Sequence, residues 1–264
     1  MAGLDIQSSI DHLVEILSQR PACVALTGAG LSTRSGIPDF RSPDAGLWAR
    51  LDRLPDVEQS RVMTIHSFKE NPAGFYQRFS PLLATILSAE PNPAHHALAR
   101  LEADGYVRAI VTQNGDMLHQ QAGSQQVIEI HGTLARAICL SCYRWDEGLP
   151  HWQQLLADGT VPHCRQCGGL LKPDVILTGE QLPALLVLKA RRLLQACDVI
   201  LAVGTSFSVR PVVDWVERAC AQGKKLAIVN LTPTSLDSVA EVVIRDDVVE
   251  VLPLVVEKLS HSHS

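Results

Sequence analysis

Short apolar runs alternate with segments of helical spacing along most of the chain. We expect a strand in each run, at residues 22–27, 107–112, 127–130, 198–203 and 225–230. Runs that are apolar at nearly every position, rather than at every second one, are typical of strands buried on both faces. The pattern therefore favours a parallel sheet that helices cover on both sides, which is an α/β fold.

The segments between these runs predict helices. Apolar residues have helical spacing in 94–103, 211–221 and 248–259, and Asn92-Pro93 ahead of the first segment is an N-cap residue followed by proline at the first helical position. Two further segments break the alternation. Residues 42–90 are helical in character but interrupted by prolines, and residues 139–172 have few apolar runs. We expect both of them to lie outside the parallel sheet.

The composition is that of a globular chain without a strong electric field. Of the 264 residues, 46% are hydrophobic and 19% are charged, which suits a folded core. The net charge of −5 gives no general attraction to nucleic acid or anionic lipid. No apolar run reaches the roughly 18–20 residues of a membrane span, and the first ten residues lack a signal-peptide pattern. We therefore expect a cytoplasmic protein that binds neither nucleic acid nor membrane.

Four of the seven cysteines form two C-x-x-C pairs, Cys139/Cys142 and Cys164/Cys167. This pattern fits a tetrahedral Zn²⁺ held by four thiolates, which leaves no open position, so the metal would be structural. A redox-active C-x-x-C would need a thioredoxin-like βαβ context, which neither pair has. A zinc ribbon for nucleic acid would need a basic surface, but basic and acidic residues balance in 139–172. The other three cysteines, Cys23, Cys197 and Cys220, are expected to be small buried hydrophobic residues.

Gly28-Ala29-Gly30 follows the first predicted strand directly. Small residues in this position let the backbone approach a pyrophosphate at a helix N-terminus. The dinucleotide-binding fingerprint is incomplete, because Thr33 stands where its third glycine would be. These three residues alone are equally typical of an ordinary turn between strand and helix.

The longer segment 28–41, GAGLSTRSGIPDFR, resembles the sirtuin family of NAD-dependent protein deacylases. Five further segments match that family in the same order: TQNGD at 112–116 with Leu118 and His119, VIEIHG at 127–132, the four cysteines, KPDVILTGEQLP at 172–183, and GTSFSVRP at 204–211 with Asn230 after the next run. Together they cover nearly all of residues 20–235. The resemblance implies NAD⁺ as cosubstrate and one structural Zn²⁺.

The resemblance also implies a division of the chain. A large Rossmann-like domain with a parallel sheet would consist of residues 1–41, 91–135 and 172–264. A small domain would consist of the helical insertion 42–90 and the zinc-binding module 136–171. NAD⁺ would then lie in the cleft between the two domains.

By the same resemblance, His131 falls on the catalytic base and Asn114 on a second catalytic position, although a lone histidine at the end of a strand is more often structural. The residues that would bind the cofactor are Gly28, Ala29, Gly30, Ser32, Asp39, Phe40, Arg41, Gln113, Asn114, Asp116, Gly204, Thr205, Ser206, Asn230 and Leu231. Without the resemblance, these positions are compatible with plain turns and helix caps. The chain departs from the family at Gly115, where a bulky aliphatic residue is usual.

The resemblance places the protein substrate at Gly179, Glu180 and Val209, where an extended peptide would add as a strand. The acyl chain would lie near Ile176, Tyr76 and Thr178. Relatives that prefer acidic acyl groups have an arginine three positions after the tyrosine, but this chain has Phe79 there and Arg78 one residue off. Thr178 stands where the family commonly has phenylalanine. We therefore expect neutral acyl groups, including some longer than acetyl, to be preferred over succinyl.

The reaction that the resemblance implies is transfer of an acyl group from a protein lysine to NAD⁺, with nicotinamide, O-acyl-ADP-ribose and free lysine as products. The expected partners are acyl-lysine proteins or peptides, and the expected state is a monomer. Two alternatives are a protein mono-ADP-ribosyltransferase on the same fold and a non-catalytic module that binds NAD⁺ or zinc. His131 counts against the first alternative, and the set of Asn114, Asp116 and His131 counts against the second.

Overall fold

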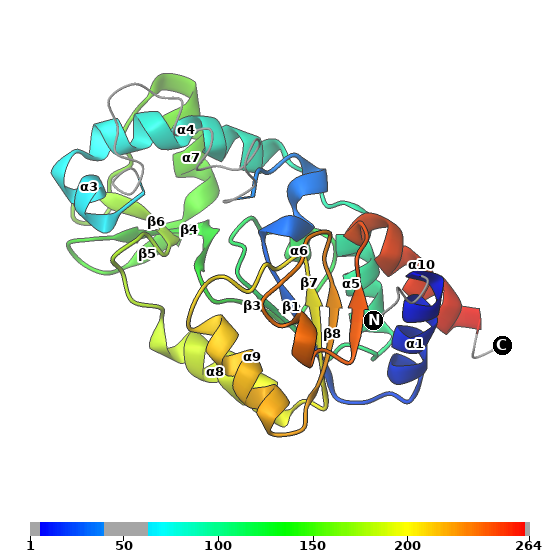
Figure 1. Cartoon of the computed structure of the whole chain (residues 1–264). Coiled ribbons are helices and arrows are strands. Elements are labelled where there is room, and N and C mark those ends of the chain that lie inside the picture. The colour runs from blue at the N-terminus through cyan, green and yellow to red at the C-terminus, as the bar shows by residue number, and fades with distance from the viewer. Residues whose placement is uncertain (1–5, 40–62, 262–264) are drawn as a thin grey trace.

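The computed structural model describes residues 6–39 and 63–261 (Figure 1). Its larger sheet has six parallel strands in the order β3-β2-β1-β7-β8-β9. Their bounds are β1 Cys23–Thr27, β2 Ala109–Thr112, β3 Val127–Glu129, β7 Val199–Val203, β8 Lys225–Val229 and β9 Val242–Ile244. The five predicted strands and the α/β class are thus confirmed. The sixth strand was not predicted, because a run of three apolar residues gives too little pattern.

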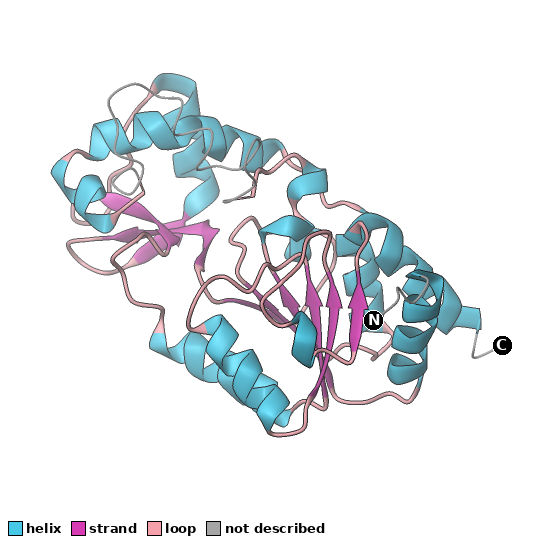
Figure 2. Cartoon of the chain, viewed as in Figure 1, coloured by secondary structure: helices cyan, strands magenta, loops and turns pink. Residues whose placement is uncertain are grey.

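Helices cover both faces of this sheet, as Figure 2 shows. On one face lie α1 (Ile6–Ser18), α5 (Pro93–Ala103) and α10 (Val248–His261), and on the other lie α8 (Ala184–Ala196) and α9 (Val212–Ala221). The predicted cap is present, since the Asn92 side chain accepts hydrogen bonds from the backbone N–H groups of Ala94 and His95. In the described part of the chain, no helix is long and apolar enough to cross a membrane.

A second, antiparallel sheet has the order β5-β4-β6. Its strands are β4 (Gly132–Cys139), β5 (Trp145–Glu147) and β6 (Leu171–Val175), and the helices around it are α3 (Ile65–Glu70), α4 (Pro72–Ser88) and α7 (Gly148–Asp158). Together they form the small domain at the upper left of Figure 1. Its core is aromatic: Phe68, Phe75 and Tyr76 are almost fully buried and meet edge to face, with ring centroids 4.9–5.8 Å apart.

The small sheet extends past the boundaries that we predicted at 135/136 and 171/172. β4 begins at Gly132 and β6 ends at Val175, because these two residues are already paired with each other. Gly132 has a φ of +81°, and a Cβ there would lie 2.0 Å from the carbonyl oxygen of Asp174. Glycine is therefore required for the two strands to meet at this end.

The order of the strands in the large sheet reverses between β1 and β7, which is the switch point of the fold. Strands β2 and β3 extend the sheet to one side of β1, while β7, β8 and β9 extend it to the other. The loops after β1 and β7 pack against each other at this switch point, where Gly30 N donates to Gly204 O at 2.9 Å. A Cβ on Gly204 would lie 2.3 Å from Leu31 N. Open α/β sheets bind their ligands at such points.

We expect Gly132→Ala to destabilise the protein by about 2–5 kcal/mol. The alanine would have to adopt the left-handed conformation of Gly132, and its Cβ would clash with the backbone of Asp174. Gly159→Ala is the matched control, since Gly159 has a φ of +76° but no atom near an added Cβ. The control should lose only about 1–2 kcal/mol. Urea unfolding of both variants measures the difference. Equal losses would show that the β4–β6 contact tolerates a methyl group.

Candidate active site

Most of the predicted site residues gather at the carboxyl edge of the large sheet. Gln113 follows β2, and its backbone N–H donates to Thr27 O at the end of β1 at 3.0 Å. Its side-chain amide donates to Thr205 Oγ1, after β7, also at 3.0 Å. Three neighbouring strand ends are therefore joined through one residue.

A chain of hydrogen bonds links Asn114, Ser32 and Asp116. The Asn114 Nδ2 group donates to Gly28 O and to Ser32 Oγ, each at 3.1 Å, and Ser32 Oγ donates to Asp116 Oδ2 at 2.6 Å. The other Asp116 oxygen accepts from Leu118 N at 3.1 Å. Burial raises the pKa of the Asp116 carboxyl, while the hydrogen bonds from Ser32 and Leu118 lower it. The glycine loop and the loop after β2 are thus held in one arrangement.

The hydrogen bond of His131 decides which of its ring nitrogens can act as a base. Nδ1 lies 3.1 Å from Gln113 O, and a carbonyl oxygen can only accept, so Nδ1 carries the proton. Nε2 then keeps its lone pair. Burial lowers the pKa of His131, and the bond to Gln113 opposes that shift in part. A neutral imidazole with a free Nε2 is suited to accept a proton near neutral pH.

Gly115 lies close to the backbone of β4. A Cβ at this position would be 2.7 Å from Gly132 O, and Gly115 O accepts from Leu134 N at 3.0 Å. The departure from the family pattern noted in the sequence therefore coincides with a close backbone approach. A larger residue would require one of the two segments to shift.

The remaining predicted cofactor residues follow β7 and β8 or close the first motif. Ser206 is exposed, and its hydroxyl lies 2.6 Å from that of Ser208. Asn230 is buried and donates to Thr232 O at 2.7 Å, whereas Leu231 is 66% exposed. Asp39 is half-buried. Phe40 and Arg41 lie outside the described residues.

Of the predicted substrate residues, Ile176 is tied directly to the predicted catalytic base, since its N–H donates to His131 O at 2.8 Å. Thr178 and Gly179 are exposed on the following turn, and Val209 is 37% exposed on another loop.

Tyr76 lies apart from that turn, in the aromatic core of the small domain. It is 1% exposed, and its hydroxyl donates to Leu171 O at 2.7 Å. Phe79 is buried as well, while Arg78 is half-buried. The Tyr76 side chain therefore supports the small domain, and its contact with an acyl chain stays a prediction.

The four predicted metal ligands lie together at the far end of β4. Their sulfur atoms are all within 4.8 Å of one another, with 3.5 Å between Cys139 and Cys167 and 3.8 Å between Cys142 and Cys164. Four thiolates at about 2.3 Å from a tetrahedral Zn²⁺ would be about 3.8 Å apart. The donor set and its spacing therefore fit zinc.

Sequence reasoning underrated two histidines. His95 and His119 lie in helices, as expected, but both are buried and their rings are 5.3 Å apart. His119 Nε2 lies 2.9 Å from Thr27 Oγ1, and burial lowers the pKa of His119 to about 4. His119 therefore contacts the last residue of β1, and His95 packs against His119. The spacing from Asn92 to His95 was the available signal, because His95 Nδ1 accepts from Asn92 N in a capping box.

The three single cysteines carry no sign of reactivity. Burial raises the pKa of all three thiols, to about 11 for Cys197. Cys23 and Cys197 are buried and Cys220 is half-buried.

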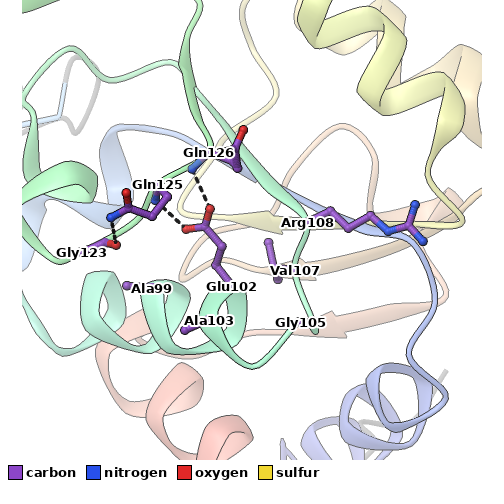
Figure 3. A pocket seen from close by; sticks show the side chains of 9 residues that line it. All are labelled: Ala99, Glu102, Ala103, Gly105, Val107, Arg108, Gly123, Gln125 and Gln126. Carbon is purple, nitrogen blue, oxygen red and sulfur yellow. Dashed lines mark hydrogen bonds between the residues drawn. The ribbon is translucent and has the colours of Figure 1, made fainter.

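A hollow of about 390 Å³ lies near the amino-terminal ends of β2 and β3, and Figure 3 shows the residues that line it. It is lined by residues of α5 and by Val107 and Arg108, which precede β2, so it lies at the opposite end of that strand from Gln113. Its Glu102 side chain already accepts from the backbone N–H groups of Gln125 and Gln126. It contains none of the predicted site residues.

The chain is similar to curated enzymes over almost its whole length. It is 40% identical to NAD-dependent protein deacylase 2 of Archaeoglobus fulgidus, covering 98% of this chain and 99% of the relative. It is 42% identical to the NAD-dependent protein deacetylase of Haloarcula marismortui, covering 95% of each.

Solved structures lead to the same result. One Sir2 enzyme matches with a TM-score of 0.86 and 38% identity over 97% of this chain and 99% of the other. Sir2Tm bound to a propionylated peptide matches with a TM-score of 0.81 and 33% identity over 94% and 98%. The sequence model of the Sir2 family matches residues 28–211. The chain therefore belongs to the Sir2 family.

Proposed function

We propose that this protein is an NAD-dependent protein-lysine deacylase. The observation that carries the proposal is the free Nε2 of His131 beside the hydrogen-bonded set of Asn114, Ser32 and Asp116. The two curated relatives described above are named for this activity, and solved Sir2 structures hold acetylated and propionylated peptides. Bound NAD⁺ supplies an electrophilic ribose carbon and nicotinamide as the leaving group.

The residues of this chain divide the work between binding and proton transfer. The Gly28–Ser32 loop and Gly204–Ser206 would hold the phosphates and the adenosine half, with Asn230 and Leu231. Asn114 and Asp116 would orient the nicotinamide and its ribose, since their polar groups are already fixed by Ser32. His131 Nε2 would then accept a proton from a ribose hydroxyl as the acyl group leaves lysine.

The protein substrate would bind between the two domains. A peptide would extend along Gly179 and Val209, and the acyl chain would lie near Ile176 and Thr178. The division into a Rossmann-like part (1–41, 91–135, 172–264) and a small domain (42–90, 136–171), the monomeric state and the cytoplasmic location belong to the same proposal.

Incubation of the protein with NAD⁺ and a panel of acyl-lysine peptides tests the activity. Mass spectrometry should show free lysine, nicotinamide and O-acyl-ADP-ribose. We expect kcat/KM to be higher for acetyl, butyryl and longer neutral groups than for succinyl, because a buried carboxylate without a cation is costly. A mass increase of the peptide or protein by ADP-ribose, without loss of the acyl group, would instead favour the transferase alternative. Succinyl in first place would contradict the expected acyl preference.

The pH dependence of kcat/KM should report His131. Because burial lowers its pKa, the neutral base persists to lower pH, and activity should fall on the acid side only below the ordinary histidine value of about 6.5. His131→Ala should lower kcat/KM by about 10²–10⁴-fold and remove this limb. NAD⁺ affinity, measured by calorimetry, should change little. A variant with the wild-type rate would refute the role.

Metal removal should unfold the small domain. Cys164→Ala is expected to lose zinc and to lower the melting temperature by about 10 °C or more, since each kcal/mol is worth roughly 2–4 °C in a chain of this size. Cys220→Ala, which lies outside the cluster, should keep both. Metal analysis and thermal unfolding check this outcome. A zinc-free protein with unchanged melting temperature and turnover would show that the metal is not structural.

A further inference from the structure

Lys172 is a buried cation in β6, the strand that precedes the predicted substrate turn. Its side chain is only 4% exposed. The ammonium group donates three hydrogen bonds, to Pro173 O at 2.9 Å, Val175 O at 2.6 Å and Glu180 Oε2 at 3.0 Å. An ammonium group has three donors, so all of them are used within the protein.

Glu180 carries this interaction into a tight turn. The turn, residues 177–180, is closed by a backbone hydrogen bond from Glu180 N to Leu177 O at 3.0 Å. The Glu180 carboxylate also accepts from Leu177 N at 2.8 Å. One carboxylate oxygen therefore links Lys172 to the first residue of the turn. Gly179, with a φ of +93°, supplies the positive φ that such turns favour.

The turn is joined on both sides to parts of the site. Before it, Ile176 N donates to His131 O at 2.8 Å. Within it, Thr178 exchanges backbone hydrogen bonds with the start of α3 and the residues before it, donating to Met63 O at 3.0 Å and accepting from Ile65 N at 3.1 Å. Leu177 is 3% exposed and packs in the core of the small domain. The exposed residues of the turn, Thr178 and Gly179, are thus the part left to face a substrate.

We propose that Lys172 is a positioning residue: through Glu180 it holds the 177–180 turn in the position in which an acyl-lysine peptide binds. This inference rests on the proposed function, since it concerns the peptide side of that site. Glu180 then serves the substrate through the turn, because its Oε2 atom accepts from both Lys172 and Leu177 N. Lys172 lies in the small sheet, whereas the loops predicted to bind NAD⁺ follow strands of the large sheet.

The physical basis is the cost of a buried charge without its partner. Removal of the ammonium leaves Glu180, Pro173 O and Val175 O without their shared donor, and the turn loses its link to β6. Removal of both charges avoids the unpaired carboxylate but also removes the link, and it leaves Pro173 O, Val175 O and Leu177 N without these partners. The two kinds of variant therefore separate stability from positioning.

Steady-state kinetics of the full-length zinc-loaded protein, with an acetyl-lysine peptide and NAD⁺, tests the proposal. Lys172→Met should raise the peptide KM by about 10-fold or more, as expected for loss of hydrogen bonds to a charged group. The KM for NAD⁺, kcat and the zinc content should stay near wild type. Lys172→Arg, which keeps a cation, should restore much of the peptide KM.

Two further variants keep the result interpretable. Lys172→Met should lower the melting temperature, because it leaves the Glu180 carboxylate without its cation. The double variant Lys172→Met/Glu180→Leu should recover part of that loss and retain the high peptide KM. Arg136→Met is the matched control, since it removes the cation of the Arg136–Asp174 ion pair on the same sheet, and within the described residues Arg136 makes no hydrogen bond to the turn. It should leave the peptide KM unchanged. Recovery of the peptide KM together with the melting temperature in the double variant would overturn the proposal.

Binding of a labelled acetyl-lysine peptide, measured by fluorescence anisotropy, separates this inference from the proposed function. Turnover by the wild-type protein tests the function alone. The ratio of peptide affinities between Lys172→Met and wild type tests the positioning role without turnover. A ratio near one, or an equal rise in the KM for NAD⁺, would contradict the role of Lys172.

Discussion

The antiparallel pairing of β4 with β6 is the contact that joins His131, the predicted catalytic base, to the cluster of four cysteines. β4 begins one residue after His131 and ends at Cys139, and β6 runs beside it from Leu171 to Val175. The two strands pair at both ends, with a shift of register between Thr133 and Ala137, so the residues next to His131 and those leading to Cys139 are held against the same partner strand. A structural Zn²⁺ held by the four cysteines would therefore stabilise the end of this pairing that lies away from His131.

Burial shifts the pKa values of two predicted site residues, Asp116 and His131. Desolvation favours the neutral form of both Asp116 and His131, raising one pKa and lowering the other. The hydrogen bonds from Ser32 and to Gln113 oppose these shifts and fix the side chains at the same time. Groups held in this way need little rearrangement when charge develops during a reaction. The same logic applies to Lys172, whose charge is satisfied inside the protein and serves to hold a turn.

Close backbone approach explains why glycines occur where they do. Gly30 and Gly204 let two loops touch at the switch point, and Gly132 lets β4 meet β6. The motif that contains Gly28 and Gly30 therefore has a packing function in the protein itself, in addition to the room that it leaves for a phosphate. Gly115 shows the same constraint at a position where the family usually has a larger side chain.

The sequence alone determined the α/β class, the buried strands and the four cysteines that gather in one cluster, and through the family motifs it predicted the residues of the reaction. These features depend on local periodicity, on spacing between ligands or on segments whose order is preserved. Strands β4, β5 and β6 were not predicted, because their residues alternate or are short and become strands only by pairing with one another. The tertiary structure alone decided the free nitrogen of His131, the burial of Tyr76, His95 and His119, and the contact between Lys172 and Glu180. Each of these depends on which atoms surround a side chain, and those atoms come from segments distant in the sequence.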